Sequence, residues 1–340
     1  MQFLGEYGLF LAKSITLVAA ILFVAANIFA LVRSAKEQSA NHLKVRNVGD
    51  RLRDLADTLN FEVLDEIERK KLQKSRKSEE KALVKARKRG EKPKPRVFVL
   101  EFDGDIQAHA VAGLREEISA LLQIARPSDE VLLRLESSGG LVHAYGLAAS
   151  QLVRLRARGL RLTVAVDKVA ASGGYLMACV ADRILAAPFA VIGSIGVVAQ
   201  IPNFNRLLKR NDIDLELHTA GEFKRTLTLF GENTDAARVK FKEDLEDTHT
   251  LFKRFVSEHR PALDLDKVAT GEHWFGTRAA ELKLVDELCS SDDYLLRRVE
   301  DAEVFEVSYE IRKPLAERLG LGMARLASAF GRKALTPGAP

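Results

Sequence analysis

The chain has 340 residues, of which 47% are apolar, and it carries 52 Lys and Arg against 47 Asp and Glu, a net charge of +5. The apolar fraction is large enough to bury a core, which excludes disorder throughout the chain. The positive charge does not indicate nucleic-acid binding, because the surplus lies in one segment, residues 69–96, without the interleaved aromatic side chains of a base-stacking surface. Two cysteines, Cys179 and Cys289, are too few for a disulfide scaffold, and we expect both in the core.

The first predicted element is an uncharged apolar stretch at residues 15–32. Its eighteen residues would rise about 27 Å as a helix, close to the bilayer hydrocarbon thickness of about 30 Å. No small-x-small cleavage site follows, so the stretch predicts an uncleaved membrane anchor over residues 1–33 and not a removed signal peptide.

Charge alone leaves open which side of the membrane holds the rest of the chain. Lys13 is the only basic residue before the apolar stretch. Six follow it closely: Arg33, Lys36, Lys44, Arg46, Arg51 and Arg53. Counted literally, the positive-inside rule places the large C-terminal part in the cytoplasm, although long domains can override that rule.

Residues 34–95 are rich in charge and have apolar residues at helical spacing between positions 52 and 67. The basic run that follows ends at Lys-Pro-Lys-Pro, residues 92–95. This composition predicts a solvated helical stalk and linker. The alternative is a basic face that lies on anionic lipid headgroups.

From residue 96 the pattern becomes that of an α/β domain, expected to span residues 96–300 and to be followed by a C-terminal tail at 301–340. Strands are predicted at 97–102, 130–135, 161–166, 184–187, 190–198 and 215–217, and helices at 108–125, 143–158 and 235–259. Strands that alternate with helices of this length imply βαβ units and a largely parallel sheet. The apolar stretch 184–201 predicts buried strands and not a second membrane span, because Pro188, Gly193 and Gly196 interrupt it.

Ser172 is the candidate nucleophile, within the sequence Val-Ala-Ala-Ser-Gly-Gly-Tyr at residues 169–175. A serine among small residues can present its hydroxyl at a tight strand-to-helix turn, where free N–H groups stabilise an oxyanion. No histidine lies between Ser172 and His218, so Lys224 is the candidate base. A lysine acts as a base only where burial lowers its pKa, and the apolar residues at 223, 227, 229 and 230 favour such a pocket.

A second glycine signal lies at residues 137–140, Ser-Ser-Gly-Gly, between a predicted strand and a predicted helix. Consecutive glycines there let backbone N–H groups point into a cleft, as an oxyanion hole needs. The pattern favours an ordinary βα loop over a phosphate-binding loop, because no Gly-Lys-Ser/Thr follows. The histidines show no metal-ligand spacing, so we expect no metal and no cofactor.

Taken in order, Ser-Ser-Gly-Gly, Ala-Ser-Gly-Gly-Tyr, Gly-Ser-Ile-Gly-Val and Gly-Glu-Phe-Lys resemble the motifs of the signal peptide peptidase A and SohB family of membrane-bound Ser-Lys peptidases. The resemblance covers about residues 96–288. The single catalytic unit, the anchor and the charged stalk are similar to the SohB branch. The family implies a ClpP/crotonase-like α/β fold, a superhelix of βαβ units around a parallel sheet.

The resemblance also implies roles for individual residues. Ser172 matches the family's nucleophile and Lys224 its general base, while Ser194 matches a serine that orients this lysine. The backbone amides of Gly139 or Gly140, and of Gly173, match the oxyanion donors, and the sequence does not choose between the first two. The family usually has Ser-Pro-Gly-Gly at 137–140, so the rigidity of this loop is in question here.

The resemblance implies a serine endopeptidase of the inner membrane that cleaves extended peptides, such as signal-peptide remnants or misfolded membrane segments. It implies a homo-oligomer and a periplasmic catalytic domain, against the literal charge count. Two other classes of function remain: a catalytically silent membrane scaffold, and a crotonase-type enzyme that processes acyl-CoA.

Overall fold

The computed structural model describes residue 22 and residues 42–89 and 94–310. The predicted anchor at 15–32 therefore lies outside the described residues except for Leu22, and so does the chain after residue 310. Within the described part, none of the helices combines the length and the apolar character that a bilayer crossing requires. Residues Lys44–Ser308 form one compact unit, which contains the candidate site.

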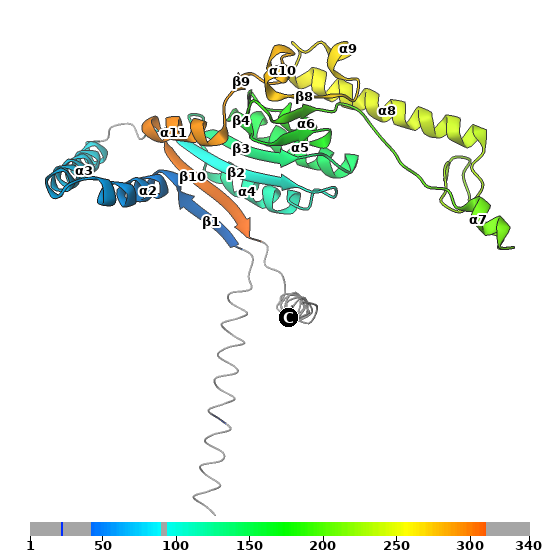
Figure 1. Ribbon diagram of the computed structural model, residues 1–340, viewed down its shortest axis with the longest axis horizontal. Helices are drawn as coiled ribbons and strands as arrows, with labels where there is room; N and C mark the ends of the chain where they lie inside the picture. The colour runs from blue at the N-terminus through cyan, green and yellow to red at the C-terminus, as the bar shows by residue number, and fades with distance from the viewer. Residues whose placement is uncertain (1–21, 23–41, 90–93, 311–340) are drawn as a thin grey trace, which may run out of the picture. The chain divides into compact units, whose positions relative to one another are not determined.

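A parallel sheet forms the centre of this unit (Figure 1). Its strands follow the order β1 (His42–Asn47), β10 (Glu303–Glu310), β2 (Arg96–Gly104), β3 (Glu130–Ser137), β4 (Arg161–Val166), β6 (Arg183–Ala186) and β9 (Glu287–Leu288). Every neighbouring pair from β10 to β9 is parallel. A short branch leaves β3: β5 (Val169–Ala171) pairs with β3 and β7 (Val191–Gly193), and β7 pairs antiparallel with β8 (His273–Phe275).

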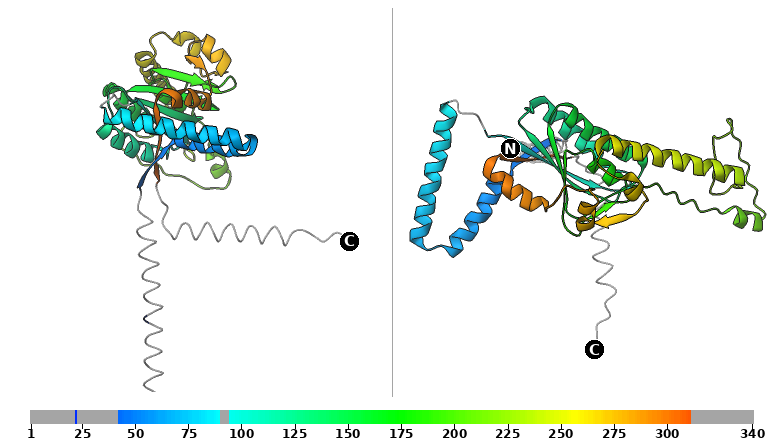
Figure 2. Two further views of the ribbon diagram at one scale, coloured as in Figure 1. Left: turned by 90° about the vertical axis from the view of Figure 1, so that its left-hand side faces the viewer. Right: turned by 90° about the horizontal axis from the view of Figure 1, so that it is seen from above.

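The sheet is buried on both faces because its strands alternate two apolar sets (Figure 2). In β2, Phe98, Leu100 and Phe102 pack in the larger core cluster, while Val97 and Val99 pack in the smaller one on the other face. Helices α4 (Val111–Ile124), α5 (Val142–Ala157) and α6 (Gly173–Ala178) supply the larger cluster. Helix α11 (Ser291–Asp301) and the first residue of α2 (Val48–Val63) supply the smaller one.

The remaining helices are α3 (Glu66–Lys88), α7 (Asn205–Arg210), α8 (Asp235–His259), α9 (Leu265–Val268) and α10 (Gly276–Glu281). Helix α8 has the bounds that the sequence predicted, because Thr234 caps it: its side chain accepts the N–H of Ala237 at 3.2 Å. In Figures 1 and 2, α8 runs from beside the sheet to α7 at its far end.

Several predicted elements need correction. Residues 215–217 form no strand, because no neighbouring strand lies beside them and they are exposed. The strand expected at 190–198 ends at Gly193, where the chain turns: Ser194 has a φ of 52° and donates its N–H to the carbonyl of Glu272. The sheet also extends past the expected boundary at residue 300, since β10 pairs with β2. Cys179 and Cys289 are buried, as predicted.

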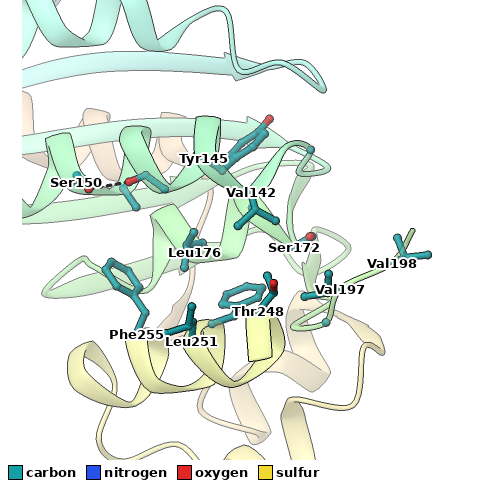
Figure 3. Close-up of a pocket in the computed structure, with 16 residues that line it drawn as sticks. Val142, Tyr145, Ser150, Ser172, Leu176, Val197, Val198, Thr248, Leu251 and Phe255 are labelled. Atoms are coloured by element: carbon teal, nitrogen blue, oxygen red, sulfur yellow. Dashed lines mark hydrogen bonds between the residues drawn. The ribbon is translucent and has the colours of Figure 1, made fainter. Parts of the chain in front are cut away.

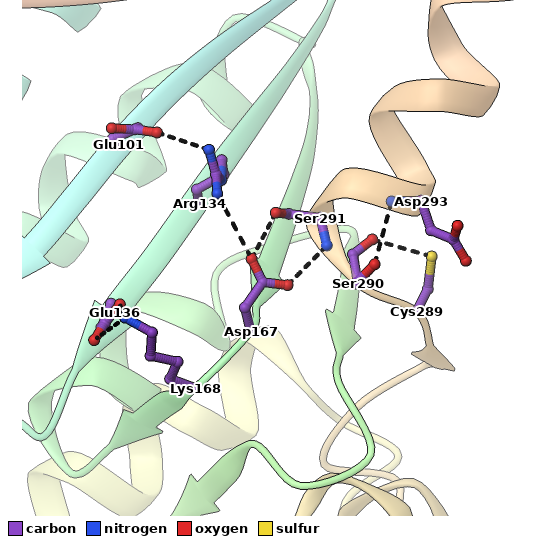
Figure 4. Close-up of polar contacts among 9 residues, drawn as sticks. All are labelled: Glu101, Arg134, Glu136, Asp167, Lys168, Cys289, Ser290, Ser291 and Asp293. Carbon is purple, nitrogen blue, oxygen red and sulfur yellow. Dashed lines mark hydrogen bonds and ion pairs between the residues drawn. The ribbon is translucent and has the colours of Figure 1, made fainter. Parts of the chain in front are cut away.

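A polar network fixes the turn between β4 and β5, which leads to Ser172 (Figure 4). The Asp167 carboxylate accepts hydrogen bonds from the N–H and the hydroxyl of Ser291, at 2.8 and 2.5 Å, and so attaches the turn to the start of α11. The neighbouring Lys168 pairs with Glu136 of β3 at 2.8 Å. The turn before β5 is therefore attached to α11 by Asp167 and to β3 by Lys168.

Candidate functional site

Ser172 occupies the turn between β5 and α6, as the sequence predicted for a nucleophile. Its backbone has φ 51° and ψ −118°, a conformation that is strained for any residue except glycine. Two hydrogen bonds hold it there: its N–H donates to the carbonyl of Gly193 at 2.8 Å, and its own carbonyl accepts the N–H of Leu176 at 3.0 Å. Within the described residues the Ser172 hydroxyl has no hydrogen-bond partner, so it is free to react.

The loop with Gly139 and Gly140 lies directly against Ser172. Gly139 has φ 89°, and a Cβ on it would come within 2.7 Å of the Gly173 nitrogen and of the Ser172 Cβ, so no other residue fits. The Gly139 N–H donates to the Ser137 hydroxyl at 3.1 Å. Among the described residues, the N–H groups of Gly140 and Gly173 have no acceptor. The geometry thus favours Gly140 over Gly139 as the partner of Gly173 in an oxyanion hole.

On one side of Ser172 an apolar cavity of ≈420 Å³ opens (Figure 3). Its walls come from the start of α5, from α6 and from the C-terminal half of α8. The largest apolar side chains on these walls are Val142, Leu176, Leu251, Phe252 and Phe255. A cavity of this size and lining accommodates an apolar side chain of a bound peptide.

On the other side, Ser172 borders a more polar cavity of ≈760 Å³. Ser194 lines it together with Ser172, so the structure brings together the two serines that the motifs singled out. Helix α8 contributes Lys242, Glu246 and His249, and the His249 ring contacts the carbonyl of Ile195 at 3.3 Å.

Lys224 does not join this arrangement within one chain. It lies in the α7 lobe, defined here as residues 203–234, and it lines neither cavity that Ser172 lines. Its side chain is exposed, and so are Phe223, Leu229 and Phe230, which were expected to bury it. The ammonium of Lys240, near the start of α8, lies 5.6 Å from the Phe223 ring centre, which places this part of the lobe at the end of α8 remote from Thr248 and Phe255.

The α7 lobe, which carries Lys224, is held in place by hydrogen bonds within the lobe. The side-chain amide of Asn203 donates to the carbonyls of Thr228 and Gly231 at 2.9 and 3.0 Å, and that of Asn205 donates to Phe230 at 2.9 Å. These bonds close the lobe on itself. The apolar pocket predicted around Lys224 is therefore absent from the single described chain.

The α8 residues of both cavities are the site residues that sequence reasoning missed. Leu245, Leu251, Phe252 and Phe255 recur at helical spacing, which from the sequence alone predicts only one apolar helix face. Such spacing predicts a packing face, whereas Leu251 is 59% exposed in the structure, and the spacing gives no sign that Ser172 lies opposite this face. No group of His, Cys, Asp and Glu in the described part of the chain could hold a metal ion.

Comparison with known proteins gives the family. Residues 2–152 match the family model described as peptidase family S49 N-terminal, and residues 154–304 match peptidase family S49. The chain is 51% identical over 325 residues to the probable protease SohB of Haemophilus influenzae, with 93% of this chain and 92% of that protein covered. It is 50% identical over 306 residues to the probable protease SohB of Buchnera aphidicola subsp. Schlechtendalia chinensis, covering 88% of this chain and all of that protein.

The two family models together extend over nearly all of the described residues, and the α/β sheet fits the ClpP-like fold that the motifs implied. The predicted resemblance to SohB proteins is confirmed. The chain belongs to peptidase family S49, a family of proteases.

Proposed function

We propose that the protein is a membrane-anchored serine endopeptidase in which Ser172 is the nucleophile and Lys224 the general base. The observation that carries the proposal is the setting of Ser172. Its free hydroxyl stands at a strained strand-to-helix turn, between the unpaired amides of Gly140 and Gly173, at the mouth of an apolar cavity.

In the proposed reaction, the neutral amine of Lys224 takes the proton from the Ser172 hydroxyl while the oxygen attacks the peptide carbonyl carbon. The amides of Gly140 and Gly173 donate to the oxyanion that forms. The lysine then gives its proton to the leaving amine, which departs and leaves an acyl-enzyme. Water, deprotonated by the same lysine, hydrolyses the ester and frees Ser172. The Ser194 hydroxyl, on the shared wall of the polar cavity, orients the lysine.

Lys224 comes from a neighbouring copy of the chain in this proposal. In the single chain the lysine is exposed. A lysine acts as a general base where burial and its neighbours lower its pKa, and the single chain does not supply that burial. Phe223, Leu229 and Phe230 of the α7 lobe expose 44 to 56% of their surface. Packing these side chains against a second copy would bury them and would supply the apolar pocket that a basic lysine needs.

The substrates proposed are extended peptides with an apolar side chain beside the scissile bond, such as signal-peptide remnants or misfolded membrane segments. The apolar cavity next to Ser172 supports this class, because it is the surface onto which the residue before the cleaved bond would be placed. The reaction needs no metal and no cofactor.

The stretch 15–32 is proposed to anchor the protein in the inner membrane, with the catalytic domain on the periplasmic side. A reporter fused after Pro340 tests the side. We expect a periplasmic reporter such as alkaline phosphatase to be active and a cytoplasmic one to be silent, and the reverse result would show that the basic residues after the anchor decide its orientation.

Reaction with a fluorophosphonate probe tests the function. We expect the full-length protein to be labelled, and the modified peptide to contain Ser172 when it is identified by mass spectrometry. A protein that no serine-reactive probe labels would instead be a scaffold. Turnover of an acyl-CoA that does not depend on Lys224 would indicate the crotonase-type chemistry.

A further inference from the structure

We propose that the buried hydroxyls of Ser137 and Tyr145 form a hydrogen-bond relay that positions the oxyanion loop, residues 138–140. The inference rests on the proposed function, and it assigns positioning roles to two hydroxyls, although the Tyr145 ring also lines the apolar cavity. Ser137 ends β3 and is 2% exposed, whereas Tyr145 lies in the first turns of α5 and is fully buried.

The contacts connect three segments of the chain. The Gly139 N–H donates to the Ser137 oxygen at 3.1 Å. The Ser137 oxygen lies 2.5 Å from the Tyr145 oxygen, and the Tyr145 hydroxyl donates to the carbonyl of Asp105 at 2.7 Å. The relay thus joins the oxyanion loop to the end of β3, to α5 and to the loop that follows β2.

The protons of this relay can be placed in only one order that uses all three short contacts. Gly139 has a donor only, and the Asp105 carbonyl is an acceptor only. The Tyr145 proton then points to Asp105, and the Ser137 proton to Tyr145 at 2.5 Å, in preference to the Gly104 carbonyl, which lies farther from the Ser137 hydroxyl at 3.3 Å. All donors then run in the same direction, which is the arrangement in which successive hydrogen bonds polarise and strengthen one another. Burial raises the pKa of the Tyr145 phenol, so its proton stays in place over the neutral range.

The relay determines which backbone N–H, that of Gly139 or that of Gly140, is available to the substrate. Because the Gly139 N–H is bonded to Ser137, the peptide plane between Ser138 and Gly139 is fixed, and the next N–H, that of Gly140, is left without an acceptor in the described structure. The Leu141 N–H donates to the Ile106 carbonyl at 2.9 Å and fixes the other end of the loop.

The relay also accounts for the rigidity of the loop around Ser138, which the sequence alone left in question. Ser138 does not restrict its own φ as a proline would. The hydrogen bonds at Ser137 and Leu141 supply rigidity at both ends of the loop. The Tyr145 ring contributes through packing, since a Cβ on Gly173 would lie 2.4 Å from the Tyr145 Cγ.

The test compares two tyrosine-to-phenylalanine variants of the full-length protein. Tyr145→Phe keeps the ring that packs against Gly173 and removes only the hydroxyl. Tyr175→Phe is the matched control: Tyr175 is as buried as Tyr145 and donates to a backbone carbonyl, that of Leu284 at 3.0 Å, but has no bond to the loop.

We expect Tyr145→Phe to lower kcat on the order of tenfold with an unchanged KM, because a misplaced oxyanion donor affects the transition state more than the bound substrate. The affinity for a peptide boronate, whose oxygen occupies the oxyanion site, should fall by the same factor. Hydrogen exchange in the peptide spanning residues 137–141 should become faster. Tyr175→Phe should change none of the three, although both variants lower the melting temperature.

A second variant, Ser137→Ala, removes the acceptor of the Gly139 N–H directly, and adding Tyr145→Phe to it should cost little more, since the relay is already broken. Equal effects of the two tyrosine variants on kcat, or unchanged exchange at residues 137–141 in Tyr145→Phe, would overturn the relay. If the wild-type protein neither cleaves peptides nor binds the boronate, the proposed function fails. In that case, hydrogen exchange at residues 137–141 still tests the relay, because it does not depend on activity.

Discussion

Replacing Ser172 with alanine is expected to reduce peptide cleavage at least about 10⁴-fold and to abolish labelling by a fluorophosphonate. In the proposed mechanism the Ser172 hydroxyl oxygen is the atom that forms the acyl-enzyme. Because the Ser172 side chain makes no hydrogen bond in the described structure, its removal should change the free energy of unfolding by less than about 0.5 kcal/mol.

The measurement is the rate of hydrolysis of a fluorogenic peptide with an apolar residue before the cleaved bond, together with the melting temperature. Ser119→Ala is a suitable control, because this serine lies on α4 and its hydroxyl accepts a hydrogen bond from Arg154 at 3.2 Å. Cleavage by Ser172→Ala at the wild-type rate would show that the strained turn has a structural role alone.

Lys224→Ala is expected to be as inactive as Ser172→Ala, and mixing the two inactive proteins is expected to restore activity. If each cleft takes its serine from one copy and its lysine from the next, a 1:1 mixed assembly contains intact clefts at about a quarter of the positions, by random placement around a closed ring. If the lysine came from the same copy, every cleft in the mixture would lack one of the two residues. The mixture would then stay inactive.

Two further lysine variants make this experiment specific. Lys209 is also exposed on the α7 lobe and pairs with Glu232 at 3.2 Å, so Lys209→Ala controls for loss of charge there and should keep activity. Lys242 lines the polar cavity with Ser172 in the single chain. A loss of activity in Lys242→Ala with none in Lys224→Ala would reassign the general base to α8.

Much of the sheet could be predicted because its residues interact locally. The alternation in β2, the run of β-branched and apolar residues in β4, and the cap at Thr234 each carry their signal within a few positions. The turn at Ser172 could also be predicted from its immediate neighbours. Residues 170–174 are small, and at Gly173 and Gly174 the turn leaves no room for a side chain.

The parts that could not be predicted depend on contacts between distant segments. The choice of Gly140 over Gly139 depends on the Ser137 hydroxyl and on the loop after β2. The walls of the apolar cavity come from α5 and α8, about one hundred residues apart. The exposed position of Lys224 depends on Asn203 and Asn205, which hold the α7 lobe together. The apolar face of α8 does leave a helical pattern, but nothing in the sequence shows which distant segment each of these groups meets.

The pairing of β10 with β2 affects when the protein can complete its folding. Glu303 lies beside Arg96 in the sheet, so two strands about two hundred residues apart in the chain must meet. Such distant pairing is slow, since a long loop has to close before the contact is made. Strand β10, which lies between β1 and β2 in the sheet, is also nearly the last part of the described chain to be synthesised. A newly made chain therefore passes through most of its synthesis with an open sheet, and the active protease is assembled only at the end.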